Sequence, residues 1–371
     1  MFPLLDLYVT TTGRIRRTES GRPFIRCNDS GVRIVEARCE ETIDQWLARD
    51  DHHLLDHHLA YDGVLGPDLG FSPLVYIQFT WFKCGGMSLG LSWAHVLGDP
   101  FSALNFINMW GEILQGHMPP KSLRLPNPVE HENPPPTSPR KPFSLKQVDP
   151  VGDSWVITNN SNMETYTFHL TPKQLENILS SVHGSVLGSA NLSSFDIIAA
   201  VIWKSLSKTR EDSGPRVVTI CTRSTQKSSA RTEVPGNNMR FGSVEADFSV
   251  AKVEASELAQ LIAEKQEDEN SLIAETVRVH QGNLGYILYG ANLTFVNLED
   301  AGVYDLKLKG QKPVFANYTI KGVGEEGTVL VLPSKSDNKT TKDVGRTITT
   351  ILPGDQLTGL RGVLRQDWNV E

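Results

Sequence analysis

A run of prolines near the middle of the chain is the sequence feature that most restricts its fold. Ten of the 21 prolines lie between Pro119 and Pro150, and three of them follow one another from Pro134 to Pro136. Because proline lacks a backbone N–H and fixes φ, this stretch can form neither a helix nor an interior strand. We expect it to cross the surface in an extended conformation, between two segments with strands and helices of their own.

The segment before this crossing carries clear strand and helix patterns. Residues 74–82 and 87–93 alternate between apolar and polar side chains, and the Gly-Gly pair between them is typical of a hairpin. From residue 101 to 114 the apolar side chains recur at helical spacing. Asp99 is a good N-cap and Pro100 a good first helical residue, so we expect the helix to begin there.

A second set of elements follows the crossing. We predict strands at residues 155–157, 164–170, 217–221, 293–296, 314–320, 328–333 and 347–352, and helices at 172–182, 195–206 and 256–279, the last as one helix or two. The small and polar segment 183–194 is the best candidate for a boundary. A chain of 371 residues is long enough for two domains. We therefore predict an α/β protein with domains at 1–186 and 187–371.

Composition excludes several classes of function. The formal charge of −7 argues against nucleic acid or an anionic membrane as the main partner. No apolar run approaches the roughly 18 residues of a membrane span, and the first residues lack the pattern of a signal peptide. The four cysteines form no C-x-x-C pair, which favours neither zinc nor a disulfide framework: Cys27, Cys39, Cys84 and Cys221. We expect a reduced, intracellular protein without a metal.

Two short motifs match enzyme patterns but lie in the wrong context. Residues 86–90 fit G-x-S-x-G, yet the strand alternation continues through Ser88, whereas a nucleophilic serine needs a strand-to-helix elbow. Residues 322–327 fit G-x-G-x-x-G, but a predicted strand follows them, whereas a dinucleotide site needs a helix N-terminus there. We interpret the first as an ordinary strand and the second as a turn between strands.

The pattern His-x-x-x-Asp occurs three times. Two copies lie within residues 52–62, a polar, histidine-rich stretch whose spacing matches no standard metal site, and we interpret it as a solvated loop. The third, His95 and Asp99, follows an apolar strand and precedes the capped helix. A partly buried imidazole at such a corner can act as a general base near neutral pH. The alternative is that His95 is a core histidine and Asp99 only a cap.

Residues 92–99, S-W-A-H-V-L-G-D, resemble the H-x-x-x-D-G signature of the plant BAHD acyltransferases. More specifically, the chain is similar to their Eceriferum/Glossy branch, the cuticular-wax elongation proteins. Four other stretches carry this resemblance, which runs nearly from end to end: residues 23–31, 64–69, 82–86 and 289–298.

The resemblance implies a fold and a set of roles. The fold would be two chloramphenicol-acetyltransferase-like domains with mixed sheets and a channel at their interface. In active members the histidine of the motif takes a proton from an alcohol or amine that attacks an acyl-CoA thioester, a role that would fall on His95. Asp99 would be structural and paired with Arg223, which ends a predicted strand. No cofactor is implied, with acyl-CoA entering as a substrate.

The chain departs from the family pattern in three places. Pro100 replaces the glycine after the motif, and residues 307–311, K-L-K-G-Q, stand where the family has D-F-G-W-G. Because that acid and that aromatic ring are lost, the resemblance does not decide whether this chain is a catalyst. Family members also carry a strand and most of a helix before the segment matched by residues 12–16, so the resemblance implies an N-terminally truncated member without its first strand.

Two functions follow from the resemblance. The first is an accessory protein that assists a 3-ketoacyl-CoA synthase in extending very-long-chain acyl-CoAs for plant wax. It would be a cytosolic monomer, recruited to the cytosolic face of the endoplasmic reticulum. The second is an acyl-CoA-dependent O- or N-acyltransferase with His95 as its general base. A decayed paralogue without function is the third alternative.

Overall fold

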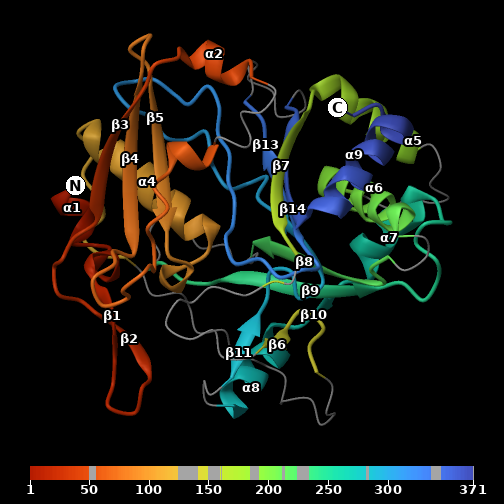
Figure 1. The fold of residues 1–371 in the computed structure, drawn as a ribbon, viewed down its shortest axis with the longest axis horizontal. Coiled ribbons are helices and arrows are strands. Elements are labelled where there is room, and N and C mark those ends of the chain that lie inside the picture. Colours follow the sequence, from red (N-terminus) through yellow and green to blue (C-terminus); the bar gives the residue numbers. More distant parts are fainter. Residues whose placement is uncertain are drawn as a thin grey trace.

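The structure is a computed structural model of the chain. It describes residues 1–49, 56–123, 141–148, 159, 161–183, 192–210, 214–223, 234–280, 284–335 and 344–370. Strands and helices occur in both halves of the chain, which confirms the predicted α/β class. Figure 1 shows the N-terminal elements on one side, and on the other a larger sheet with helices packed against it.

The N-terminal part is a small sheet beside one long helix. Its three strands are ordered β3-β4-β5, with β3 parallel to β4 and β4 antiparallel to β5. The bounds of the elements in this part are α1 Phe2–Leu5, β1 Arg14–Arg17, β2 Pro23–Arg26, β3 Arg33–Cys39, α2 Ile43–Leu47, β4 Val75–Phe82, β5 Met87–Trp93 and α4 Pro100–Leu114. The predicted hairpin around the Gly-Gly pair is confirmed as β4 and β5.

Helix α4 covers this sheet and begins at the predicted residue. The Asp99 side chain accepts a hydrogen bond from the backbone N–H of Ser102, and Pro100 is the first helical residue. The helix buries Phe106 completely, and its ring meets that of Tyr8 edge to face at 5.1 Å between centroids. The same ring lies 5.5 Å from that of Trp93 in β5, so its burial holds the helix against the sheet.

The larger sheet has seven strands in the order β10-β9-β8-β12-β13-β14-β7. It is mixed, because β12 runs parallel to both of its neighbours while the other pairs are antiparallel. The bounds are β7 Met163–Leu170, β8 Val217–Arg223, β9 Met239–Glu245, β10 Glu267–Asp268, β12 Leu293–Asn297, β13 Thr328–Pro333 and β14 Arg346–Pro353. Five of the predicted strands are thereby confirmed, at 164–170, 217–221, 293–296, 328–333 and 347–352.

Helices cover one face of this sheet, as Figure 1 shows for α5, α6, α7 and α9. The helices of the second half are α5 Pro172–His183, α6 Ser194–Thr209, α7 Ala255–Lys265, α8 Asn270–Val279 and α9 Gly354–Trp368. Helix α6 is the centre of the layer, since it contacts α5, α7 and α9. Its Trp203 is fully buried and donates from Nε1 to the Pro215 carbonyl at 2.6 Å. Helix α5 is capped by Thr171, whose hydroxyl accepts from the Gln174 N–H.

Short elements complete the described part of the chain. Two strands, β6 Lys146–Val148 and β11 Gly285–Ile287, form a separate antiparallel pair. Short 3-10 helices lie at Val9–Thr12, Asp56–Leu59 and His95–Leu97. Among the helices that the structure describes, none combines the length and the apolarity needed to cross a bilayer.

The strand predicted at 314–320 is wrong. This segment forms no ladder, because its contacts are with side chains on the face of β7 and β14 rather than with the backbone of an edge strand. Side chains hold it instead: the Asn317 amide donates to Thr167 Oγ1 at 3.2 Å and accepts from Thr349 Oγ1 at 2.9 Å.

Several other predictions fall on residues outside the described ranges. These are the strand at 155–157, residues 124–140 of the proline-rich crossing, and the boundary at 186/187. The division into two domains therefore stays a prediction. A cut at that position would separate β7 and α5 from the sheet and the helices with which they pack.

Candidate functional site

His95 lies where the N-terminal sheet gives way to helix α4. It is the first residue of the 3-10 helix His95–Leu97, with one residue between it and the end of β5, and it is half-buried. The indole N–H of Trp93 donates to the Gly98 carbonyl at 3.0 Å, which closes this short turn. The apolar alternation of β5 and the capped start of α4 thus place the imidazole at a fixed corner.

The ring that faces His95 comes from the second half of the chain. Tyr289 Oη lies 3.3 Å from His95 Nε2, and the two ring centroids are 5.3 Å apart. Only 9% of Tyr289 is exposed. Burial raises the pKa of its phenol well above the ordinary value, and the nearby Cys221, Tyr318 and Asp99 raise it further. The phenol is therefore protonated at neutral pH and can donate a hydrogen bond.

Asp99 is held by backbone N–H groups. One carboxylate oxygen accepts from Ser102 N at 3.0 Å and the other from Asn238 N at 2.9 Å. At the N-terminus of α4 the helix dipole also favours the negative charge. The guanidinium of Arg223 lies 5.0 Å from the centre of the Phe101 ring, in the first turn of α4. The implied pairing of Asp99 with Arg223 stays a prediction.

Residues 234–238 bind this corner from the second half of the chain. The backbone N–H of Asp99 donates to the Gly236 carbonyl at 3.1 Å, and the Asn237 amide donates to the His95 carbonyl at 3.0 Å. The approach is close, since a Cβ on Gly98 would lie 2.9 Å from the backbone nitrogen of Gly236. Sequence reasoning missed this segment, although the polar string P-G-N-N at 235–238 is a turn signal that could have indicated it.

The loop at 307–311, which replaces the D-F-G-W-G signature, lies against the C-terminal end of α4. The Gln115 side chain donates to the Lys307 carbonyl at 3.4 Å. Leu308 and Gln311 exchange two backbone hydrogen bonds of 3.0 Å each. Lys309 and Gly310 between them have φ values of 50° and 80°, as the central residues of a type I′ turn do. The loop packs against the C-terminal end of α4, whereas His95 lies just before the N-terminal end of that helix.

Replacing Lys309 by asparagine is expected to stabilise this loop. Asparagine tolerates a positive φ better than lysine does, and Asn-Gly is the preferred pair of a type I′ turn. We expect the free energy of unfolding to rise by about 0.5–1 kcal/mol. Urea unfolding measures it, with Lys307→Asn as the matched control, since it removes the same charge. Equal stability of the two variants would contradict the turn assignment.

The remaining motifs have structural roles. Ser88 lies inside β5, opposite Thr80, so the interpretation of G-x-S-x-G as an ordinary strand is confirmed. The glycine-rich string has positive φ at Gly322 and Gly327 and leads into β13, so it is a turn before a strand, although no strand directly precedes it. Asp62 forms an ion pair with Lys321. No group of three or more metal-ligating side chains occurs within the described ranges.

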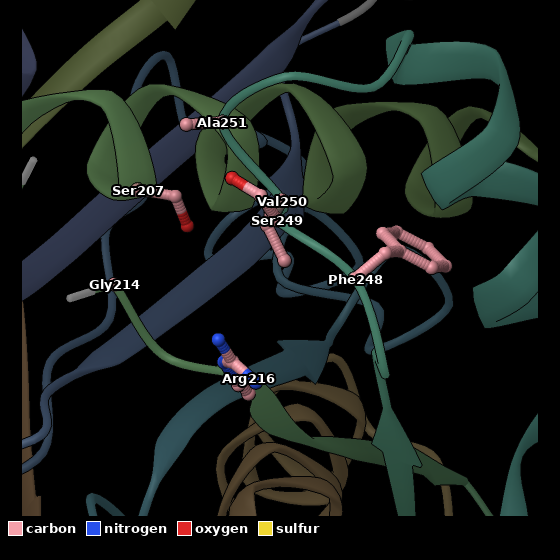
Figure 2. A pocket seen from close by; sticks show the side chains of 7 residues that line it. All are labelled: Ser207, Gly214, Arg216, Phe248, Ser249, Val250 and Ala251. Carbon is pink, nitrogen blue, oxygen red and sulfur yellow. The ribbon is translucent and has the colours of Figure 1, made fainter. Parts of the chain in front are cut away.

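Two cavities in the described part of the chain lie away from His95. The first, of about 10 Å³, holds no more than a water and lies between the end of α6 and residues 248–251, as Figure 2 shows. The second, of about 240 Å³, lies at the end of α4 and is lined by Met109, Glu112, Ile113, His117, Met118 and the two following prolines. The implied channel to His95 stays a prediction.

Comparisons with known proteins identify what the chain is similar to. A family model described as Transferase family matches residues 2–361. Protein ECERIFERUM 2 of Arabidopsis thaliana is 38% identical over 368 residues, which cover 96% of this chain and 82% of that protein. Protein ECERIFERUM 26-like of the same plant is 38% identical over 357 residues, covering 95% and 79%.

Solved structures share the fold. Vinorine synthase matches with a TM-score of 0.64 at 19% identity, and the match covers 96% of this chain and 80% of that one. At this identity the likeness concerns the fold alone. It confirms the predicted acyltransferase-like architecture with mixed sheets.

Proposed function

The chain belongs to the Transferase family, the BAHD acyltransferases, and on that basis we propose that it is an accessory protein of very-long-chain acyl-CoA elongation for cuticular wax. Its partner would be a 3-ketoacyl-CoA synthase, whose products it would lengthen. The observation that carries the proposal is the likeness to the ECERIFERUM proteins over nearly the whole chain. The branch that they represent is the one to which the wax-elongation role belongs.

The site supports an accessory role in two ways. The loop at 307–311 has two lysines where the family signature has an acid and an aromatic ring. In addition, Nε2 of His95 already has a partner in Tyr289. A general base must have a free lone pair within reach of the proton that it takes, and here that position is occupied.

The second candidate function is acyl transfer from acyl-CoA to an alcohol or amine. It is favoured by the preserved corner, where His95 is half-buried and Asp99 is fixed by two backbone N–H groups. In that reaction His95 would take the proton of the attacking group, and the proton would finally reside on the leaving CoA thiol. The two functions differ in whether His95 acts.

Co-expression in yeast tests the proposal. A plant 3-ketoacyl-CoA synthase would be expressed in three strains: by itself, together with this chain, and together with an empty vector. The lengths of the acyl chains would be measured by mass spectrometry. We expect the products to be at least two carbons longer when both proteins are present. Unchanged products at equal synthase levels would contradict the proposal, and acylated alcohols or amines formed without the synthase would favour the second candidate.

Recruitment to the endoplasmic reticulum is part of the same proposal. The protein would reach the cytosolic face of that membrane by binding the synthase. We expect it to co-sediment with yeast microsomes only when the synthase is present, at matched expression levels. Equal co-sedimentation with and without the synthase would contradict recruitment by this partner.

A further inference from the structure

The contact between His95 and Tyr289 restricts what the imidazole can do. A neutral imidazole has one N–H and one lone pair, on different nitrogens. If the phenol donates to Nε2, the lone pair of Nε2 is already used. If Nε2 carries the hydrogen and donates to the phenol oxygen, Nε2 has no lone pair, and the phenol hydrogen can point to Met239 Sδ at 3.7 Å. In both arrangements an incoming hydroxyl finds no acceptor at Nε2.

We propose that Tyr289 is a positioning residue that withholds Nε2 of His95 from acid–base chemistry, so that acyl transfer requires the two rings to separate. The withholding of Nε2 rests on the proposed function in one respect: an accessory protein of the elongase needs no free base, whereas an acyltransferase does.

The surroundings of Tyr289 keep the phenol in place. Its side chain is 9% exposed and packs edge to face against Phe241, at 5.8 Å between ring centroids. Its backbone carbonyl accepts from Gly324 N at 2.9 Å, and the next residue, Gly290, donates its N–H to Thr294 Oγ1 at 3.1 Å. The side chain and backbone are thus both anchored in the second half of the chain. Moving the phenol away from His95 would disturb these contacts.

The withheld step can be written for the simplest acceptor, water. The water oxygen forms a bond to the thioester carbonyl carbon while its proton passes to Nε2 of His95. The carbon–sulfur bond then breaks, and the imidazolium returns the proton to the CoA thiolate. The products are a fatty acid and CoA, and no other reactant is needed. Without a lone pair on Nε2, the first proton transfer has no acceptor.

Nitrogen NMR on the full chain, labelled at histidine with ¹⁵N, tests the contact directly. The Nε2 resonance of His95 is assigned by its loss in His95→Gln. We expect Tyr289→Phe to shift that resonance by several parts per million, because the hydrogen bond is lost while the ring remains. Met239→Leu is the matched control, since it removes the sulfur but keeps the phenol, and we expect the resonance to stay near its original position.

Two NMR results would overturn the proposal. The first is an Nε2 resonance that does not move in Tyr289→Phe. The second is an equal shift in Met239→Leu, because repacking rather than the loss of the phenol would then be the cause. Thermal unfolding of each variant verifies that it is folded.

Thioester hydrolysis in the same purified variants tests the consequence. Because a positioned general base contributes about 10²–10⁴-fold to a proton transfer, we expect Tyr289→Phe to hydrolyse stearoyl-CoA at least about tenfold faster than the unaltered chain. The gain should vanish in Tyr289→Phe combined with His95→Gln. A rate no higher than that of the unaltered chain would overturn the withholding role. Since neither measurement involves the synthase, failure of the elongation assay would not affect their outcome.

Discussion

Replacing Asp99 by alanine is expected to lower the free energy of unfolding by about 3 kcal/mol. The side chain is 4% exposed and caps α4 through Ser102 N, and it also accepts from Asn238 N in the second half of the chain. Alanine leaves both N–H groups without this acceptor in a buried site. Urea unfolding of the purified variant measures the loss.

Thr171→Ala is the control for this variant. Thr171 caps α5 at the surface through Gln174 N, so its removal costs the cap alone, about 1 kcal/mol. The additional loss of unfolding free energy in Asp99→Ala, beyond that in Thr171→Ala, then measures the contact of Asp99 with residues 234–238. If both variants lost the same stability, Asp99 would be only a cap, and the corner would not depend on the second half of the chain.

Gly290→Ala is expected to cost at least about 3 kcal/mol and to displace Tyr289. The residue has a φ of +81°, and a Cβ built on it would lie 2.5 Å from the Gly324 carbonyl oxygen and 2.6 Å from its nitrogen. Both atoms are backbone, so they cannot rotate out of the way. The segment must shift, and Tyr289 must move with it. Urea unfolding gives the stability, and the His95 Nε2 resonance gives the displacement.

Gly21→Ala isolates the backbone part of this effect. Gly21 has the same φ of +81°, but a Cβ added to it would have no neighbouring atom within 4 Å. Only the left-handed conformation is therefore penalised, by about 1–2 kcal/mol. An unchanged His95 resonance in Gly290→Ala, or a loss of stability no larger than in Gly21→Ala, would contradict the close packing of Gly290 on Gly324.

Local signals made the elements around His95 predictable. The hairpin of β4 and β5 follows from alternation and a Gly-Gly pair, and the start of α4 follows from Asp99 and Pro100. These signals lie within a few residues of the structure that they specify. Helix α9, Gly354–Trp368, was missed despite its buried leucines, because three glycines weaken its helical pattern.

The partners of the site could not be predicted from the same signals. Tyr289 lies almost 200 positions after His95, and no local pattern pairs the two rings. The same holds for Asn238, whose backbone N–H donates to the Asp99 carboxylate from 139 positions further along the chain. The packing of two distant segments decides which backbone N–H approaches a buried carboxylate. The residues that determine this packing are spread over both halves of the chain.

The central claim is that the chain lengthens acyl products without acid–base chemistry at His95. The elongation assay with His95→Gln tests it most directly, since glutamine retains a polar side chain at that corner but cannot act as a base. We predict the same product lengths as with the unaltered chain when both proteins are expressed at equal levels. Loss of the lengthening, with His95→Gln folded and its thermal midpoint unchanged, would contradict the account.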